Sequence, residues 1–329
     1  MAIIRRWAAA LAATGMLLAA GAAHSQYATE LGKLAPESLK GGEKPQAAQL
    51  QQVAPDLYFF WNDVSSNALF LVTDEGVLVV DAQQHPADAR RLLGLIRTVT
   101  DKPIRWLVVT HAHGDHFLGN PVFKAEGATI ISHRDTRAMM QKYYADEVQR
   151  RQDYFKRHNL DPNELKMVLP DVTFDTRFTV HLGGRTIELM NWGAAQNPGD
   201  TLIHFPHARL LFLGGPFSRR NWPNFTFTPS VENWISILRK AAALDVDAYI
   251  GGHGDVGTRA DVLVYAQMLQ DFLNEVKAGI AAGKSRDELA DSIRMPQYSQ
   301  FRNYHRLRGW VYALHNLLST GKPMAPLAN

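Results

Sequence analysis

Four residues of types that bind metal ions lie close together in the chain: His111, His113, Asp115 and His116. They follow a hydrophobic run at 104–109, so they occupy a tight loop at the end of an expected strand. In such a loop the histidines of a His-x-His pair can face one metal ion, while Asp115 and His116 turn toward a second position nearby. The chain contains no cysteine, which excludes thiolate ligands, disulfides and a cysteine nucleophile. The loop predicts a metal site built from imidazole, carboxylate and amide groups.

The elements that must position this loop fall into two β-rich halves, each with helices. In the first half, hydrophobic runs and turn residues predict strands and one amphipathic helix at 57–61, 68–72, 77–80, 86–99 (helix), 104–109 and 129–132. Residues 134–166 are rich in charge and predict one or two surface helices broken at 159–162. The second half predicts strands and one helix at 178–182, 186–190, 202–205, 210–213, 231–244 (helix) and 248–250. This order indicates an α/β fold, a four-layer sandwich with its two sheets face to face.

The loop at 111–116 resembles the His-x-His-x-Asp-His signature of the metallo-β-lactamase superfamily. A Gly-Asp-Thr segment at 199–201 and a Gly-Gly-His-Gly turn at 251–254 extend the resemblance. It implies the αββα sandwich and a hydrolytic site with one or two metal ions, usually zinc, with manganese or iron as alternatives. By matching position, His111 and His113 would bind the first ion, and Asp115, His116 and His253 the second. Asp115 would also act in catalysis by orienting the nucleophile.

Two positions depart from the family pattern. Gln196 stands where the family supplies another histidine to the first metal, and Gly215 stands where many family hydrolases have an aspartate that bridges both ions. An amide oxygen can bind zinc, but it matches zinc less well than an imidazole nitrogen. The departures therefore leave two hypotheses open. One is a metal-activated hydrolase of an ester, lactone or amide bond, including a β-lactam; the other is a catalytically weakened or non-catalytic binding protein of the periplasm.

Other side chains are expected around the site. Asp81 ends a hydrophobic strand beside the metal loop, and we expect it either to hold a ligand histidine in place or to cap a turn. His133 ends the strand at 129–132, on an edge that could form a wall of the cleft. Trp222 and Phe225 lie in an aromatic and basic loop after the missing bridging position, which could bind a substrate. We expect these last three residues to line the substrate pocket.

The chain divides into four segments on composition. Residues 1–25 have the basic start, apolar middle and small-residue end of a secretory signal peptide, and the apolar stretch is too short for a comfortable membrane span. A polar arm is expected at 26–52, the metallo-β-lactamase-like domain at 53–257, and a helical extension packed on it at 258–329. We expect a periplasmic or secreted protein with no stable membrane anchor after cleavage.

The expected partner is a small-molecule substrate. The formal net charge is only +3, from 35 Lys and Arg against 32 Asp and Glu, and no block of basic residues is present. Nucleic acid is therefore not expected as a partner. No feature of the sequence points to a particular oligomeric state.

Overall fold

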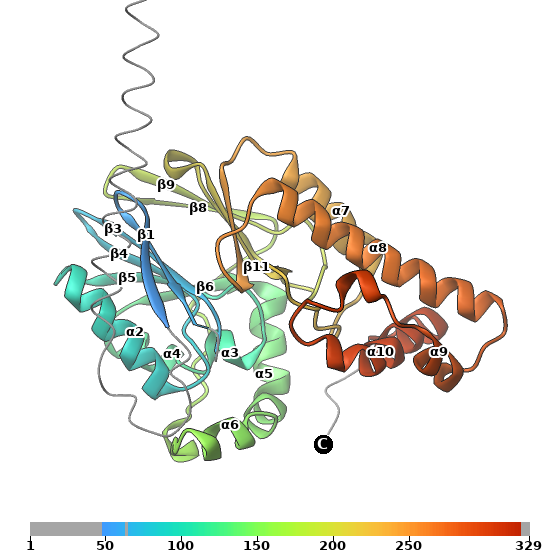
Figure 1. Ribbon diagram of the computed structural model, residues 1–329. Coiled ribbons are helices and arrows are strands. Elements are labelled where there is room, and N and C mark those ends of the chain that lie inside the picture. The colour runs from blue at the N-terminus through green and yellow to red at the C-terminus, as the bar shows by residue number, and fades with distance from the viewer. Residues whose placement is uncertain (1–47, 63–64, 324–329) are drawn as a thin grey trace, which may run out of the picture.

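The computed structural model describes residues 48–62 and 65–323, and it forms two β-sheets that face each other with helices on both outer sides (Figure 1). This is the α/β sandwich that the sequence predicts. The first sheet has seven strands in chain order: β1 (Gln49–Ala54), β2 (Leu57–Trp61), β3 (Ala68–Thr73), β4 (Gly76–Val80), β5 (Ile104–Val108), β6 (Thr129–His133) and β7 (Val172–Phe174). Its first four strands are antiparallel neighbours, and β4 to β7 are parallel.

The second sheet has five strands, in the order β12-β11-β10-β9-β8. The strands are β8 (Arg177–Leu182), β9 (Arg185–Met190), β10 (Leu202–Phe205), β11 (Leu210–Ser218) and β12 (Ala248–His253). Only the β11–β12 pair is parallel. Because β4, β5 and β12 end on the same side of the sandwich, the loops that follow them come together there.

The strands alternate between two hydrophobic layers. On β3, Leu69 and Leu71 point into the core between the sheets, where they join side chains of the second sheet such as Ile203 and Phe212. Phe70 points the other way, toward the outer helices. Successive side chains of a strand face opposite sides of the sheet, so a strand covered on both faces reads as an unbroken hydrophobic run. This is why β3 and β4 could be located from the sequence.

The helices cover the two outer faces (Figure 1). Those on the first sheet are α2 (Pro86–Val99), α3 (Gly114–Phe117), α4 (Asn120–Ala125), α5 (Arg134–Gln149) and α6 (Gln152–Arg157). Those beside the second sheet are α7 (Val231–Ala242), α8 (Arg259–Ala281), α9 (Arg286–Ser292) and α10 (Leu307–Thr320). Short 3-10 turns lie at Pro162–Glu164, Pro206–Ala208, Pro296–Tyr298 and Tyr304–Arg306. None of the described helices has the length and apolar character needed to cross a bilayer.

The structure corrects several expected boundaries. Part of the predicted polar arm is strand β1, which begins at Gln49 and pairs with β2, and β7 was not expected because it has only three residues. The charged helical region has the predicted break, since α6 ends at Arg157, but it has an additional break at Arg150 and Arg151. Strand β11 continues through Gly215 to Ser218, past the predicted end at 213. The predicted signal peptide at 1–25 lies outside the described residues.

Candidate metal centre

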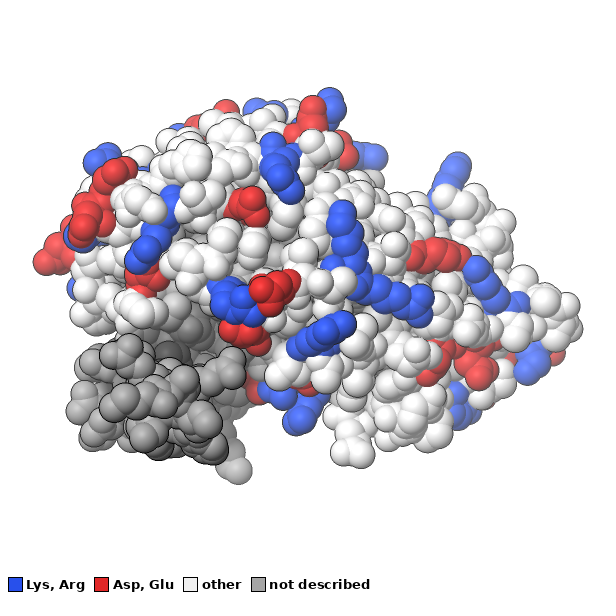
Figure 2. Space-filling model, turned by 90° about the horizontal axis from the view of Figure 1, so that it is seen from above, with Lys and Arg blue, Asp and Glu red and all other residues white. Residues whose placement is uncertain are grey.

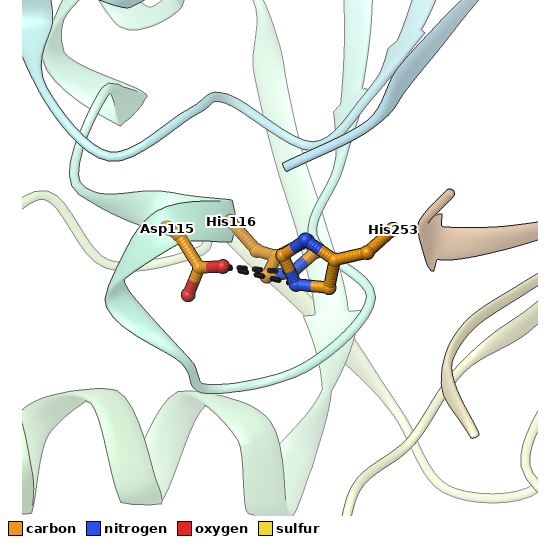
Figure 3. Close-up of side chains that lie close together, drawn as sticks. All are labelled: Asp115, His116 and His253. Carbon is orange, nitrogen blue, oxygen red and sulfur yellow. Dashed lines mark ion pairs between the residues drawn. The ribbon is translucent and has the colours of Figure 1, made fainter. Parts of the chain in front are cut away.

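Three of the residues expected to bind metal converge at one point. Asp115 and His116 lie on the short helix α3, and His253 ends β12 on the second sheet (Figure 3). One potential ligand atom from each lies within 4.8 Å of the other two. The Asp115 Oδ2 atom is 3.2 Å from His253 Nε2 and 3.5 Å from His116 Nε2. The side chains therefore meet across the gap between the two sheets.

The Asp81 carboxylate holds His116 in place from behind. Asp81 directly follows β4 and is fully buried. Its Oδ2 atom lies 2.7 Å from His116 Nδ1, which fixes a proton on that nitrogen and points Nε2 toward Asp115. Asp81 also accepts hydrogen bonds from the backbone N–H and the hydroxyl of Thr110, so it joins the ends of β4 and β5. It contacts the histidine as one of the two sequence hypotheses expects.

The same reasoning assigns the proton on two other histidines. The Thr110 hydroxyl donates its only proton to Asp81, so at 2.9 Å from His111 Nδ1 it must accept a proton from that ring. His253 Nδ1 lies 3.1 Å from the carbonyl oxygen of Ser65, to which it can only donate. In both rings Nδ1 is therefore occupied by a hydrogen bond, and Nε2 is the nitrogen that could bind a metal ion.

His111 and His113 are neutral because they are buried beside other imidazoles. Burial, with His116 and His113 nearby, lowers the pKa of His111 well below its usual value. Burial is also the main cause that lowers the pKa of His113 to about 4. Asn197 Nδ2 lies 3.4 Å from His113 Nε2, so that nitrogen faces a donor. Metal binding requires neutral imidazoles, and at neutral pH these two rings need not lose a proton first.

The two oxygen atoms of the Asp115 carboxylate contact different residues. Its Oδ2 atom faces the histidines, and its Oδ1 atom accepts a hydrogen bond of 2.5 Å from Arg151 Nη2. Burial opposes ionisation of Asp115, but His116 and Arg151 hold its pKa well below the ordinary value. Arg151 in turn donates to the fully buried Glu147, which also accepts from the backbone N–H of Gly114. This chain of contacts anchors α3, and with it Asp115, to α5.

Gln196 and Gly215 occupy one small space together. A Cβ atom on Gly215 would lie 2.3 Å from Gln196 Oε1 and 3.0 Å from Asp200 Oδ1. Both oxygens are buried, and neither has a hydrogen-bond partner among the described residues. Burial raises the pKa of Asp200 to about 8, so in the metal-free chain this carboxyl is largely protonated at neutral pH. The Gln196 amide thus occupies the space that the side chain of an aspartate at position 215 would need.

A cavity of about 530 Å³ opens beside these residues. Its wall includes four of the expected ligands: His113, Asp115, Gln196 and His253. His111 and His116 lie deeper and do not line it. The donor set fits a divalent cation: the Nε2 atoms of two imidazoles face the Asp115 carboxylate, and the buried Nε2 of His116 makes no hydrogen bond with the described residues.

The expected pocket residues separate into one that lines the cavity and two that do not. Trp222 lines it, although its ring is mostly buried against Phe272. Phe225 is a core residue instead, 2% exposed and packed on Trp234 and Phe272. His133 is also buried. Its ring accepts a hydrogen bond from the backbone N–H of Asp135 and so caps the first turn of helix α5. The pocket assignments of Phe225 and His133 are therefore corrected.

The sequence analysis missed Arg151, Glu147 and Thr110. Arg151 and Glu147 lie in a region whose many charges are typical of a solvent-exposed helix, and no local pattern shows that these two face inward. Thr110 could have been found, since it lies between the strand and His111 in the same loop.

Comparison with known proteins gives one family match. The model of the Metallo-beta-lactamase superfamily matches residues 61–253. The chain is 26% identical over 183 residues to 2,4-dinitroanisole O-demethylase subunit alpha of Nocardioides sp. (strain JS1661), covering 55% of this chain and 50% of that protein. It is 22% identical over 262 residues to the linear primary-alkylsulfatase of Pseudomonas sp. (strain ATCC 19151), covering 68% and 49%. The chain thus spans about half the length of these two relatives.

Solved structures share the fold at low sequence identity. The stereoselective inverting sec-alkylsulfatase Pisa1 from Pseudomonas sp. superposes with a TM-score of 0.66 at 17% identity, over 85% of this chain and 53% of that one. A metallo-beta-lactamase from Pontibacter korlensis gives a TM-score of 0.54 at 18% identity, over 68% of this chain and 98% of that one. At such identities the likeness shows a common architecture.

Proposed function

The chain belongs to the metallo-β-lactamase superfamily, and on that premise we propose that it is a metal-dependent hydrolase of an ester, lactone or amide bond, with a β-lactam among the candidates. The observation that carries the proposal is the convergence of Asp115, His116 and His253 beside a cavity, which is lined by two of them, Asp115 and His253, and by His113 and Gln196. We propose zinc as the metal, as one or two ions, with manganese or iron as alternatives.

Asp115, His116 and His253 would hold the divalent cation, which would supply a lowered pKa for a bound water molecule and polarisation of the substrate oxygen that gains charge. The chain supplies the orientation. Asp81 and Ser65 fix the rings of His116 and His253 so that both Nε2 atoms face the Oδ2 atom of Asp115. Arg151 keeps Asp115 ionised, so this carboxylate serves as a ligand and is a poor acceptor for a proton at neutral pH. We therefore assign the catalytic part of Asp115 to positioning.

We further propose that the protein is exported to the periplasm or secreted. The support is the pattern of residues 1–25, which has the basic, apolar and small-residue regions of a signal peptide. Expression of the full chain and N-terminal sequencing of the product would test this. A start at Gln26 in a periplasmic or culture fraction is expected, and an uncleaved cytoplasmic product would contradict export.

The hydrolase proposal is tested with the chain from Gln26, purified without a histidine tag and equilibrated with limiting zinc, manganese and iron. Elemental mass spectrometry gives the metal content, and chromogenic ester, lactone and cephalosporin substrates give turnover. We expect His113→Ala to lower metal affinity or activity by about 10- to 100-fold. The matched control is His181→Ala, an exposed histidine on β8.

Two results would contradict the proposal. Turnover that survives His113→Ala unchanged would mean that another protein in the preparation is responsible. A chain that binds metal and hydrolyses none of the three substrate classes would favour the non-catalytic binding protein, which the replaced residues Gln196 and Gly215 also support.

A further inference from the structure

Arginine side chains are concentrated around the cavity beside the metal centre. Five arginines line it, and they come from two separate parts of the chain: Arg150, Arg151, Arg157, Arg302 and Arg306. The first three lie at the end of α5 and on α6, and the last two lie just before α10. Among the described residues, the carboxylates that line the cavity are Asp115 and Asp153.

Two of the arginines serve the structure. Arg151 pairs with Asp115 and Glu147, and Arg150 pairs with Glu147. Arg157 makes a different contact: its Nε atom donates to the backbone oxygen of Asp153, at 3.3 Å. Arg306 forms no ion pair with any residue that the structure describes, and both Arg157 and Arg306 are exposed. Arg157 and Arg306 therefore bring positive charge to the cavity wall that no described residue pairs with in an ion pair.

The segment that carries Arg306 is fixed in place. The backbone of Arg302 pairs with the loop after β11, donating to the carbonyl oxygen of Arg220 and accepting from the N–H of Trp222. Asn303 Nδ2 donates to Asn221 Oδ1 at 2.8 Å. Arg306 thus lies on an anchored turn. This turn is far in the sequence from α6, the helix that carries Arg157. A guanidinium binds carboxylate, sulfate and phosphate through two parallel hydrogen bonds, which suits it to oxyanions.

We propose that the substrate is a small organic anion whose oxyanion group, remote from the bond that is cleaved, is bound by Arg157 and Arg306. This rests on the proposed hydrolase function, since it places the scissile bond at Asp115 and His253 in the same cavity. On the face shown in Figure 2, blue basic and red acidic side chains are interspersed, so that face offers no continuous basic surface. Binding of a large polyanion would need a wider basic surface.

The test compares two esters that differ only in charge. One is the mono-4-nitrophenyl ester of glutaric acid, and the other is the same ester with its free carboxylate capped as an amide. We expect KM to be roughly tenfold lower for the anionic ester, because a charge-assisted hydrogen bond contributes about that factor. Arg306→Gln and Arg157→Gln should each raise this KM toward that of the capped ester and leave kcat unchanged. The matched control is Arg308→Gln, which removes an arginine of α10 that pairs with Asp291 and does not line the cavity.

A binding measurement separates this inference from the hydrolase proposal. Titration calorimetry with glutarate, sulfate and phosphate reports anion binding without turnover. Glutarate binding that Arg306→Gln weakens would support the anion site even if neither ester is cleaved, in which case the hydrolase proposal alone fails. Binding of sulfate or phosphate that Arg306→Gln weakens in the same way would also support the anion site. It would identify the oxyanion as the group that is recognised. Equal KM values for both esters, with no anion bound, would overturn the inference and leave the hydrolase intact.

Discussion

Gln196 and Gly215 depart from the family pattern together, and the structure gives a packing reason. With no side chain at 215, the amide oxygen of Gln196 can lie against the backbone of β11, beside Asp200. An aspartate at 215 would need the same space. An aspartate restored at 215 alone would therefore displace the Gln196 amide from its present position.

Gly215→Ala tests this coupling. The new Cβ would lie 2.3 Å from Gln196 Oε1, the mobile end of a side chain, so the amide should move away while the backbone stays. We expect zinc affinity to fall by about tenfold or more if this amide is a ligand. Competition with a zinc-sensitive dye measures it, and Gly94→Ala, at a glycine of α2 with open space around it, is the control. An equal loss in a Gln196→Ala background would assign the effect to His111 instead.

Most individual residues of the candidate site could be identified from the sequence. The residues His111, His113, Asp115 and His116 are adjacent in the chain, so their pattern could be read directly. The sequence did not reveal Arg151, which reaches Asp115 from 36 positions away. Its inward direction depends on where α5 ends, and no local pattern encodes that end.

Helix α5 has a weak hydrophobic pattern and an unusual buried residue. Its fully buried side chains are Thr136, Met140 and Glu147, and the partly buried Tyr144 and Val148 pack on the same hydrophobic cluster as Met140. Polar contacts of Glu147 with Arg150, Arg151 and the N–H of Gly114 also position the helix. Strands β3 and β4 are the opposite case, because their hydrophobic runs made their location predictable.

Glu147→Gln should therefore lower the free energy of unfolding, by about 3–5 kcal/mol, as expected when one partner of a buried ion pair is removed. Burial opposes ionisation of Glu147, but Arg151 and Arg150 lower its pKa overall. A carboxyl with a lowered pKa in the folded state stabilises the protein above its unfolded pKa, near 4.3, and loses that contribution as the pH falls.

The measurement is urea unfolding of both proteins with a chelator present, from pH 8 down to pH 4. The difference in the free energy of unfolding between the wild type and Glu147→Gln should be constant from about pH 6 to 8. It should shrink below about pH 4.5, since protonation removes the charge from the wild-type Glu147. A difference that stays constant to the lowest pH would show that Glu147 acts through packing instead of charge.

For the whole molecule, the predicted boundary at 257/258 does not separate two cores. Side chains of α8, such as Val262 and Phe272, belong to the same hydrophobic cluster as Trp234 of α7 and Leu213 of β11. The helical extension packs on the sandwich, as expected, but it also forms part of the layer that covers the second sheet. Composition could indicate helices there, whereas only the structure shows that they complete this core.

Phe272→Ala tests whether the extension unfolds with the sandwich. Phe272 is fully buried against Trp222 and Phe225, so its removal should lower the free energy of unfolding by about 3–5 kcal/mol. Leu263→Ala, on the same helix and 42% exposed, should have little effect. Urea unfolding followed by tryptophan fluorescence and by circular dichroism should give one coincident transition. Two separate transitions would show that the extension is an independent unit.

The backbone pairing of Arg302 with the loop after β11 has a consequence for proteolysis of the chain. The candidate metal ligands all lie between His111 and His253, whereas Arg302 and Arg306 follow them. A product cut after His253 would therefore retain every candidate ligand and lose the part of the cavity wall that carries Arg306.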